Sequence, residues 1–287
     1  MDAKTKNSAI SAQRDELTEH YIYLRLAKRC KDSKNAGVLR NIGEQEMIHA
    51  RFWQSITGIN IKPDKFRLHR TVFLTRILGL TFVLKLMEKR EGTGSKTYTE
   101  LSSVFPEAEN FLKEERNHES EILKMLDEER LKYVGSIVLG LNDALVELTG
   151  ALAGFTLALG DTRLITLAGL VTGISASLSM AASDYLSSKA EGDTRAKKSA
   201  VYTGISYLIT VILLILPYLL LSSKFIALSI TLLTAVFIIF CFNYYISVSK
   251  ELNFRHRFLE MTIISLGVAA FSFLIGFVLK TILGVGV

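Results

Sequence analysis

The sequence predicts an all-α protein in two parts, a soluble four-helix bundle over residues 1–132 and five transmembrane helices over residues 133–287. Residues 1–132 are rich in Lys, Arg, Glu and Asp, whereas long apolar runs alternate with short charged connectors from Tyr133 onward. Such a shift is expected where the surroundings change from water to lipid. The first part also contains four segments with mixed apolar and charged faces, which is typical of helices that pack in water.

The four soluble helices are expected over residues 9–30, 35–57, 68–91 and 106–132. The connector between the second and third, Gly58 to Arg67, reaches roughly 33 Å when extended, enough to run back along a helix of about 20 residues. One long crossover is a ferritin-like trait. Gly92 to Gly94 and Pro106 mark the end of the third helix and the start of the fourth.

A Glu-x-x-His spacing occurs twice in this part, as Glu46 with His49 on the second helix and as Glu115 with His118 on the fourth. Each motif places its two side chains on one helix face. Di-iron carboxylate bundles use two such motifs and one further Glu from each of the other two helices. Carboxylates with one imidazole on each side suit iron or manganese. The sequence therefore predicts a di-metal centre.

The other two helices should each supply one inward Glu. The first offers Glu16, with Glu19 as the alternative, and the third offers Glu88 or Glu91. A solvated charged face is the alternative interpretation of any single motif, but two motifs on separate helices are harder to obtain by chance. His20 and His69 have no partner at ligand spacing, and we expect them at the surface.

Five apolar stretches in the second part are each long enough to cross a hydrocarbon core, which takes about 20 helical residues. They cover residues 134–160, 164–188, 199–221, 225–247 and 259–283. The connectors after the second and fourth stretches carry four and three Lys or Arg, and the other two carry only Arg163 and Lys224. Because basic connectors stay in the cytosol, we expect an integral protein of the cell membrane, with its N-terminal domain in the cytosol and its C-terminus outside.

Two of the membrane stretches contain acidic residues. Asp143 and Glu147 share one face of the first, and Met180 and Asp184 have the same spacing in the second. A carboxylate at membrane depth is costly unless it faces protein, water or an ion, and carboxylate oxygens with one thioether suit a transition metal. The alternatives are that Met180 fills a packing gap and that Glu147 and Asp184 lie near the interfaces.

The runs Gly140–Glu147 and Ser179–Tyr185 resemble the first- and second-helix signatures of the vacuolar iron transporter family. The likeness covers roughly residues 133–287 and implies five spans, a homodimer and proton-coupled export of ferrous or manganous ions from the cytosol. It also implies that Asp143 and Met180 line the metal path. Position 184 is Asp where the family often has Glu. The plant members' Glu-rich insertion after the second span is reduced here to about ten residues.

The first part, over residues 9–132, resembles the erythrin or rubrerythrin branch of the ferritin-like superfamily. The resemblance rests on the segment from Glu16 to Ala27 and on both Glu-x-x-His motifs. It implies a di-iron cofactor, with manganese as the alternative, and Glu91 or Glu119 as extra ligands. The implied set is Glu16, Glu46, His49, Glu88, Glu115 and His118.

Composition excludes several other classes. The formal charge is +6, but no basic stripe interleaved with aromatic residues is present, so we expect no nucleic-acid partner. The two cysteines, Cys30 and Cys241, form no Cys-x-x-Cys pair and cannot build a disulfide framework or a rubredoxin centre.

These observations together predict a transporter that exports ferrous or manganous ions across a lipid bilayer against protons, with a bundle that captures or oxidises the metal. One alternative is a membrane-anchored ferroxidase or peroxidase that does not transport. Another is a bundle that acts as a regulatory metal sensor beside a manganese transporter. The apolar run from Thr71 to Met87 offers a further alternative, since it could lie against the bilayer as an amphipathic helix. We disfavour that placement because Glu88 is needed in the ligand set.

Overall fold

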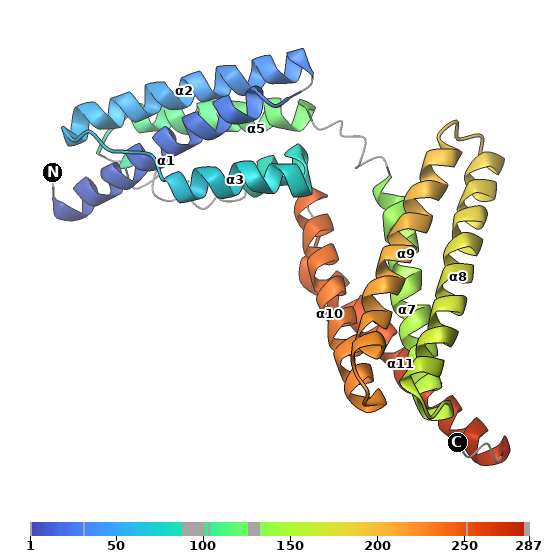
Figure 1. The fold of residues 1–287 in the computed structure, drawn as a ribbon. Coiled ribbons are helices and arrows are strands. Elements are labelled where there is room, and N and C mark those ends of the chain that lie inside the picture. Colours follow the sequence, from blue (N-terminus) through green and yellow to red (C-terminus); the bar gives the residue numbers. More distant parts are fainter. Residues whose placement is uncertain are drawn as a thin grey trace. The chain divides into compact units, whose positions relative to one another are not determined.

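The fold is described from a computed structural model, in which residues 2–30, 32–87, 101–102, 104–125, 133–250 and 252–283 are placed. All regular secondary structure in these ranges is helical. The chain divides into two compact units, residues 1–128 and 129–287 (Figure 1). We call them unit 1 and unit 2 and describe each by itself.

Unit 1 contains α1 (Ala3–Ala27), α2 (Ser33–Thr57), α3 (Lys65–Leu78) and α5 (Glu107–Met125). An aspartate caps each of the first three helices, because the side chains of Asp2, Asp32 and Asp64 accept hydrogen bonds from backbone N–H groups of the first turn. α2 ends at Gly58, whose φ of 67° is the left-handed conformation that favours glycine.

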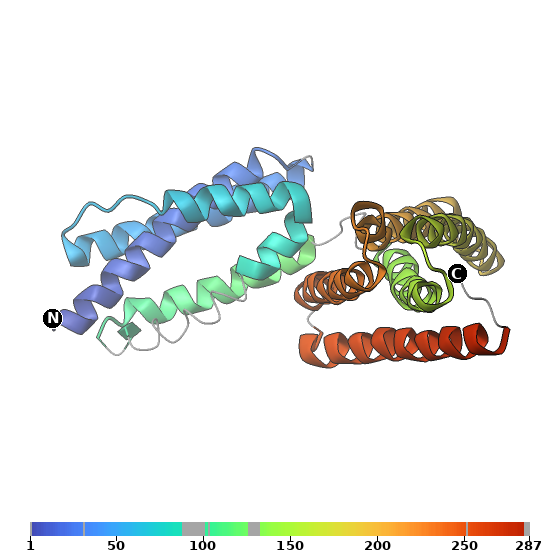
Figure 2. The same ribbon diagram turned by 60° about the horizontal axis from the view of Figure 1, so that its bottom comes forward.

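The expected third helix is broken. α3 ends at Gly79, whose φ of 92° and ψ of 164° lie in a region that is essentially restricted to glycine. A helical segment resumes at Leu80 and is described as far as Met87. Figure 2 shows the sharp turn at this point. The prediction of one helix over residues 68–91 is therefore wrong as far as Met87, and its last four residues lie outside the described residues.

The connector between α2 and α3 also differs from expectation. It is held to α1 at two points, where Gln13 donates to the Ile59 carbonyl and Thr18 accepts from the Asp64 N–H. Gln13 and Thr18 are separated by only about 8 Å along the helix, so the connector does not run back along a whole helix. α3 begins at that point and itself continues the path along α1.

The core of unit 1 lies between α1, α2 and α5. Trp53 is fully buried there and packs edge-to-face with Phe52 and Phe105. Phe111 of α5 lies against both Phe52 and His49. This packing joins α2 to α5 beside the polar residues described below.

Unit 2 contains five helices that are long and apolar enough to cross a membrane. They are α7 (Val134–Ala158), α8 (Thr162–Ala190), α9 (Ala196–Leu220), α10 (Lys224–Ser249) and α11 (Phe254–Leu283). α7 contacts each of the other four. Figure 2 shows α11 from the side while the other four are seen nearly end-on. Large apolar side chains such as Leu167, Val171 and Leu178 are exposed on the outside, as expected for a surface solvated by lipid.

Candidate metal centre

Five of the sequence-predicted ligands come together inside unit 1. Glu16 belongs to α1, Glu46 and His49 to α2, and Glu115 to α5, and one ligand atom from each lies within 4.8 Å of the others. His118 of α5 adjoins this group, with its Nδ1 3.3 Å from a Glu46 oxygen. α2 packs against both α1 and α5, which is why residues far apart in the sequence meet here.

His49 defines one half of the cluster. Its Nδ1 lies 3.6 Å from Glu16 Oε2, 3.4 Å from Glu46 Oε2 and 3.7 Å from Glu115 Oε1. Ligand atoms around a metal bound at about 2.1 Å are separated by similar distances.

His118 defines the other half. Its Nδ1 lies 3.3 Å from Glu46 Oε1 and 3.8 Å from Glu115 Oε2. Glu46 and Glu115 thus each turn one oxygen toward His49 and the other toward His118. Both carboxylates therefore face both histidines, whereas Glu16 lies on the His49 side.

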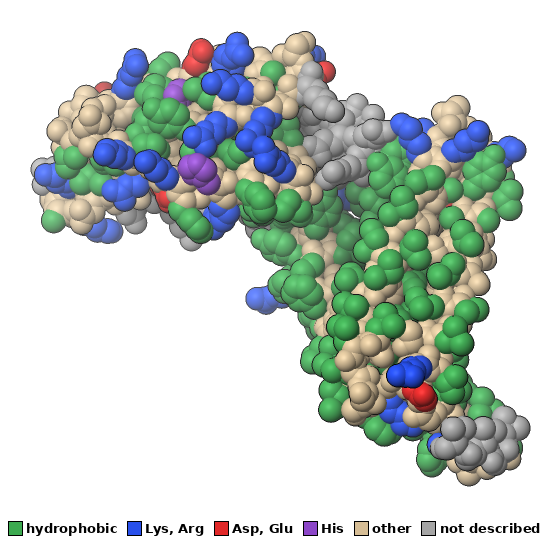
Figure 3. All heavy atoms as spheres, in the orientation of Figure 1, with side chains coloured by type: hydrophobic (Ala, Val, Ile, Leu, Met, Phe, Trp, Pro, Cys, Tyr) green, Lys and Arg blue, Asp and Glu red, His purple; other side chains and the backbone are tan. Residues whose placement is uncertain are grey.

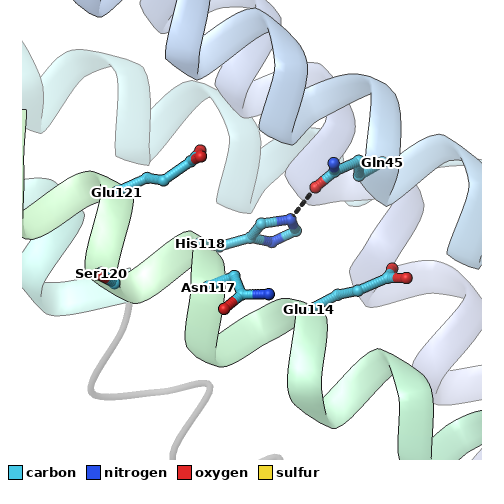
Figure 4. A pocket seen from close by; sticks show the side chains of 6 residues that line it. All are labelled: Gln45, Glu114, Asn117, His118, Ser120 and Glu121. Atoms are coloured by element: carbon cyan, nitrogen blue, oxygen red, sulfur yellow. Dashed lines mark hydrogen bonds between the residues drawn. The ribbon is translucent and has the colours of Figure 1, made fainter.

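Each imidazole also makes a hydrogen bond through its second ring nitrogen, Nε2. His49 Nε2 lies 2.7 Å from Glu114 Oε2, and His118 Nε2 is hydrogen-bonded to the side-chain oxygen of Gln45 (Figure 4). When each Nε2–H donates to these acceptors, each Nδ1 keeps its lone pair and faces the carboxylates. Metal-bound histidines generally have such a partner, which sets the tautomer and the ring orientation.

Gln45 and Glu114 are functional candidates that the sequence interpretation missed. Each directly precedes the Glu of one motif and bonds the His of the other motif, because α2 and α5 run antiparallel here. The signal in the sequence was a polar acceptor at the same offset in both motifs.

A pocket of about 320 Å³ opens on this side of the cluster. Its lining residues are Gln45, Glu114, Asn117, His118, Ser120 and Glu121 (Figure 4).

The electrostatics of the cluster fit a cation. Burial, together with the charges of the neighbouring carboxylates, holds the pKa of Glu16 and of Glu46 well above the usual range. Burial acts to lower the pKa of His49, but the negative charges of Glu16 and of the other carboxylates beside it outweigh that effect and raise the pKa.

Buried polar atoms without hydrogen-bond partners support the same conclusion. Among the described residues, both Glu46 oxygens, His49 Nδ1, Glu115 Oε2 and His118 Nδ1 have none. Such atoms are rare and call for an explanation such as an ion. All of them point into one cluster of carboxylate oxygens and imidazole nitrogens, a donor set that suits iron or manganese.

The structure separates the two acidic candidates on α1. Glu19 is ion-paired with Arg67, which also bonds Asp15 at 2.7 Å. Arg67 therefore engages Glu19 away from the cluster. Among the described residues of α1, Glu16 is the one that belongs to the cluster. The candidates Glu88 and Glu91 lie outside the described residues, as does the side chain of Glu119.

The two remaining histidines of unit 1 differ from each other. The expectation that His20 lies at the surface is wrong, because its side chain is buried and its Nδ1 bonds the Gly43 carbonyl oxygen. The contact holds α1 to α2. His69 is exposed as expected and bonds the Lys65 carbonyl of its own helix.

The carboxylates of the first membrane helix lie toward the outside of the single chain. Asp143 is half-buried on α7, and Glu147, one turn further, is exposed. Glu147 Oε2 accepts a hydrogen bond of 2.7 Å from Tyr207 of α9. Sequence interpretation missed Tyr207, which lies 60 positions away.

The polar residues of α8 have different surroundings. Asp184 Oδ2 accepts hydrogen bonds from Thr203 at 2.6 Å and from Ser199 at 2.8 Å, both on α9. Met180 is half-buried and packs against the apolar core of unit 2. In the described part of unit 2, no group of three or more His, Cys, Asp or Glu gathers at ligand distance.

Residues 134–199 match the VIT family. The match contains α7, α8 and the first residues of α9, and so includes all four of the polar candidates in the membrane helices. It supports the resemblance of unit 2 to vacuolar iron transporters, and with the five apolar helices it supports an integral membrane protein that transports metal ions. A search of curated proteins finds no match to the chain.

Two Gly-x-x-x-Gly patterns within the matched segment contact helices of the same chain. On α7, a Cβ at Gly150 would lie 3.0 Å from Ser272 of α11, and Gly154 faces the same helix. On α8, a Cβ at Gly169 would meet Leu152 of α7, and Gly173 faces α9. These glycines permit close helix packing within one chain, so they do not support a dimer.

Proposed function

We propose that this chain transports ferrous iron out of the cytosol through unit 2, with manganese as the alternative cargo, and first captures the metal in unit 1. The observation that carries the proposal is the presence in one chain of a VIT-family segment and a buried cluster of carboxylates and imidazoles. Neither part by itself implies the other, and both have chemistry suited to the same metals.

In unit 1 we propose a ferritin-like di-iron centre. Glu46 and Glu115 would bridge the two ions, His49 and Glu16 would hold one, and His118 would hold the other. On the His118 side, Glu88 or Glu91 would supply the further carboxylate that the third helix contributes in such centres. An iron pair held there would let ferrous iron pass its electrons to oxygen or peroxide, which would be the oxidant. The protein's own part is to orient both Nδ1 atoms and to exclude water from the bridging oxygens.

In unit 2 we propose that Asp143, Glu147 and Met180 line the metal path. A carboxylate inside the membrane can hold either a proton or a cation, which provides a physical basis for exchange of metal against protons. The bond from Tyr207 orients Glu147, and the hydroxyls of α9 fix Asp184 as a link between α8 and α9.

We further propose a homodimer. Glu147 is exposed in the single chain, and a carboxylate that faces lipid is costly. A second copy that covers this face of α7 would remove that cost.

The basic connectors at residues 189–198 and 250–257 favour an arrangement with unit 1 in the cytosol and the C-terminus outside.

The second candidate is a membrane-anchored ferroxidase or peroxidase. It is favoured by one observation, namely that metal-ligating side chains gather in unit 1 and not in the described part of unit 2. In that case the five helices serve as an anchor and no metal crosses the bilayer.

Flux measurements in sealed proteoliposomes of known protein orientation, with a pH gradient, distinguish the two candidates. We expect Asp143→Ala to abolish ferrous and manganous flux, and Glu46→Ala with Glu115→Ala to weaken it. The matched control is Asp193→Asn, in a half-buried connector carboxylate that pairs with Arg195. If the unaltered protein moves no metal yet consumes oxygen or peroxide in the presence of iron, the anchored enzyme is correct.

A further inference from the structure

The outer face of α3 carries a stripe of large apolar side chains that are more than half exposed. Phe66, Phe73 and Ile77 are 75%, 58% and 55% exposed. With Arg70 they occupy positions that recur every three to four residues, and so form one line along the helix. The opposite face, with Leu68 and Val72, is buried. Large apolar side chains are therefore exposed on a helix whose other side already completes the core.

Cations border this stripe. Lys65, His69, Arg70 and Arg76 are exposed, and Arg70 lies 5.8 Å from the centre of the Phe66 ring. No Asp or Glu occurs from Lys65 to Met87. Figure 3 shows this face with Lys, Arg and hydrophobic side chains intermixed.

Because the helix breaks at Gly79, α3 can lie at the surface while the next segment leads to the predicted ligand Glu88. Residues 80–87 are a separate helical segment in which Phe82, Val83, Leu84 and Met87 are buried. The segment that leads to Glu88 can thus belong to the core while α3 remains outside. An exposed α3 and a ligand at Glu88 are compatible.

We propose that α3 is a membrane-contact helix, whose Phe66, Phe73 and Ile77 enter the interfacial layer of the bilayer in which unit 2 is embedded. A basic helix with an apolar stripe has the composition of helices that lie in the plane of an anionic membrane surface. The contact keeps the metal centre of unit 1 beside the bilayer.

The short connection between the two units favours lipid as the partner that contacts the apolar stripe of α3. Only residues 126–133 separate the end of α5 from the start of α7, and a segment of this length reaches at most about 30 Å. The connection therefore limits how far unit 1 can move from the bilayer, and a tether this short makes the local concentration of lipid high. The cations complement anionic headgroups, and each one near such a surface changes the docked population about five-fold.

The test uses the full chain in nanodiscs. Cys30 and Cys241 are replaced by Ser, and an environment-sensitive fluorophore is attached to Phe73→Cys. The matched control is Ile48→Cys, because Ile48 of α2 is 61% exposed and Phe73 is 58% exposed. Emission of the buried Trp53 checks that each variant is folded.

We expect brominated phospholipids to quench the label at position 73 and not the label at position 48 when the discs contain anionic lipid. Arg70→Gln with Arg76→Gln should lower the ratio of docked to undocked protein roughly 25-fold. Equal exposure of both labels to water would overturn the proposal, and so would equal quenching of both by lipid. A label at position 73 that is shielded from water but not quenched would show that protein, such as a second copy, covers α3. Quenching does not depend on metal flux, so a failure here leaves the proposed function standing, and loss of flux does not affect this result.

Discussion

Replacement of Glu46 by Gln should affect the metal-free and metal-bound forms of unit 1 in opposite directions. Glu46 is fully buried, and neither of its oxygens has a hydrogen-bond partner among the described residues. Without a metal it is one of three carboxylates beside the same nitrogen atom, His49 Nδ1. The amide has the same shape, is uncharged at every pH and can donate to Glu16 or Glu115. We therefore expect Glu46→Gln to stabilise the metal-free protein.

The size of the effect follows from burial. A buried polar atom without a partner costs about 1–3 kcal/mol, and replacement of buried charges by neutral groups often stabilises a protein by about 1–4 kcal/mol. We expect a gain of about 1–2 kcal/mol without metal. A metal at one hundred times its Kd stabilises the unaltered protein by about 2.7 kcal/mol, and the variant should lose most of this because one of the two carboxylates that face both His49 and His118 is gone.

The assay exploits Trp53, which is the only tryptophan in the sequence and is fully buried in unit 1. Its emission during denaturant unfolding of the full chain reports on unit 1 alone, with chelator or with Mn²⁺. The control is Glu109→Gln, in an exposed carboxylate 3.4 Å from Lys113, which should change either value by less than about 0.5 kcal/mol. If Glu46→Gln destabilises the metal-free protein and still responds fully to Mn²⁺, Glu46 is a structural residue and not a bridging ligand.

Three further predictions follow from the same structure. Burial raises the pKa of Glu16 and Glu46 above the ordinary value of 4.5, so their contribution to the stability of the metal-free form is complete below that value and is lost as pH rises through the folded pKa. Unfolding midpoints at pH 5 and pH 8 should therefore fall with pH in chelator, whereas stabilisation by Mn²⁺ should grow, and the opposite trends would contradict this assignment. Glu114→Ala should lower the metal affinity of unit 1 about 10–100-fold in chelator competition, with partial recovery in Glu114→Gln, and an unchanged affinity would show that orientation of His49 does not matter. Gly140→Ala should prevent stable packing of unit 2, since its Cβ would overlap the Thr203 carbonyl oxygen, whereas Gly135→Ala meets nothing within 4 Å. Size-exclusion profiles in detergent check this, and equal profiles for both variants would refute the close approach of α7 and α9.

Much of the fold follows from local patterns in the sequence. Apolar runs of spanning length predicted the five helices of unit 2 to within a few residues at most ends, because membrane depth sets their length. The second soluble helix was predicted closely, the first begins at Ala3 and not at residue 9, and the fourth begins at Glu107, while its predicted end lies outside the described residues. Gly79 was not recognised as a break, because a single glycine within an apolar run is compatible with either a continuous helix or a turn. Only its φ and ψ distinguish these.

The candidate metal centre was predicted in part for a similar reason. The two Glu-x-x-His motifs are local spacings on single helices, and they could be identified before any packing was known. Their outer partners Gln45 and Glu114 were not identified, since each supports a histidine on the other helix. That pairing depends on the register between α2 and α5.

The sequence by itself determined that one part of this protein is rich in charge and the other apolar enough to span a membrane, that both parts are helical, and that two helices carry paired Glu and His. These properties depend on composition and on spacings of a few residues. The tertiary structure alone decided between Glu16 and Glu19, because the residue that engages Glu19 is Arg67, 48 positions away. It also decided that Glu46 and Glu115 each face both histidines, and that α3 remains on the surface. Distances between helices decide these features, and no local pattern in the chain encodes them.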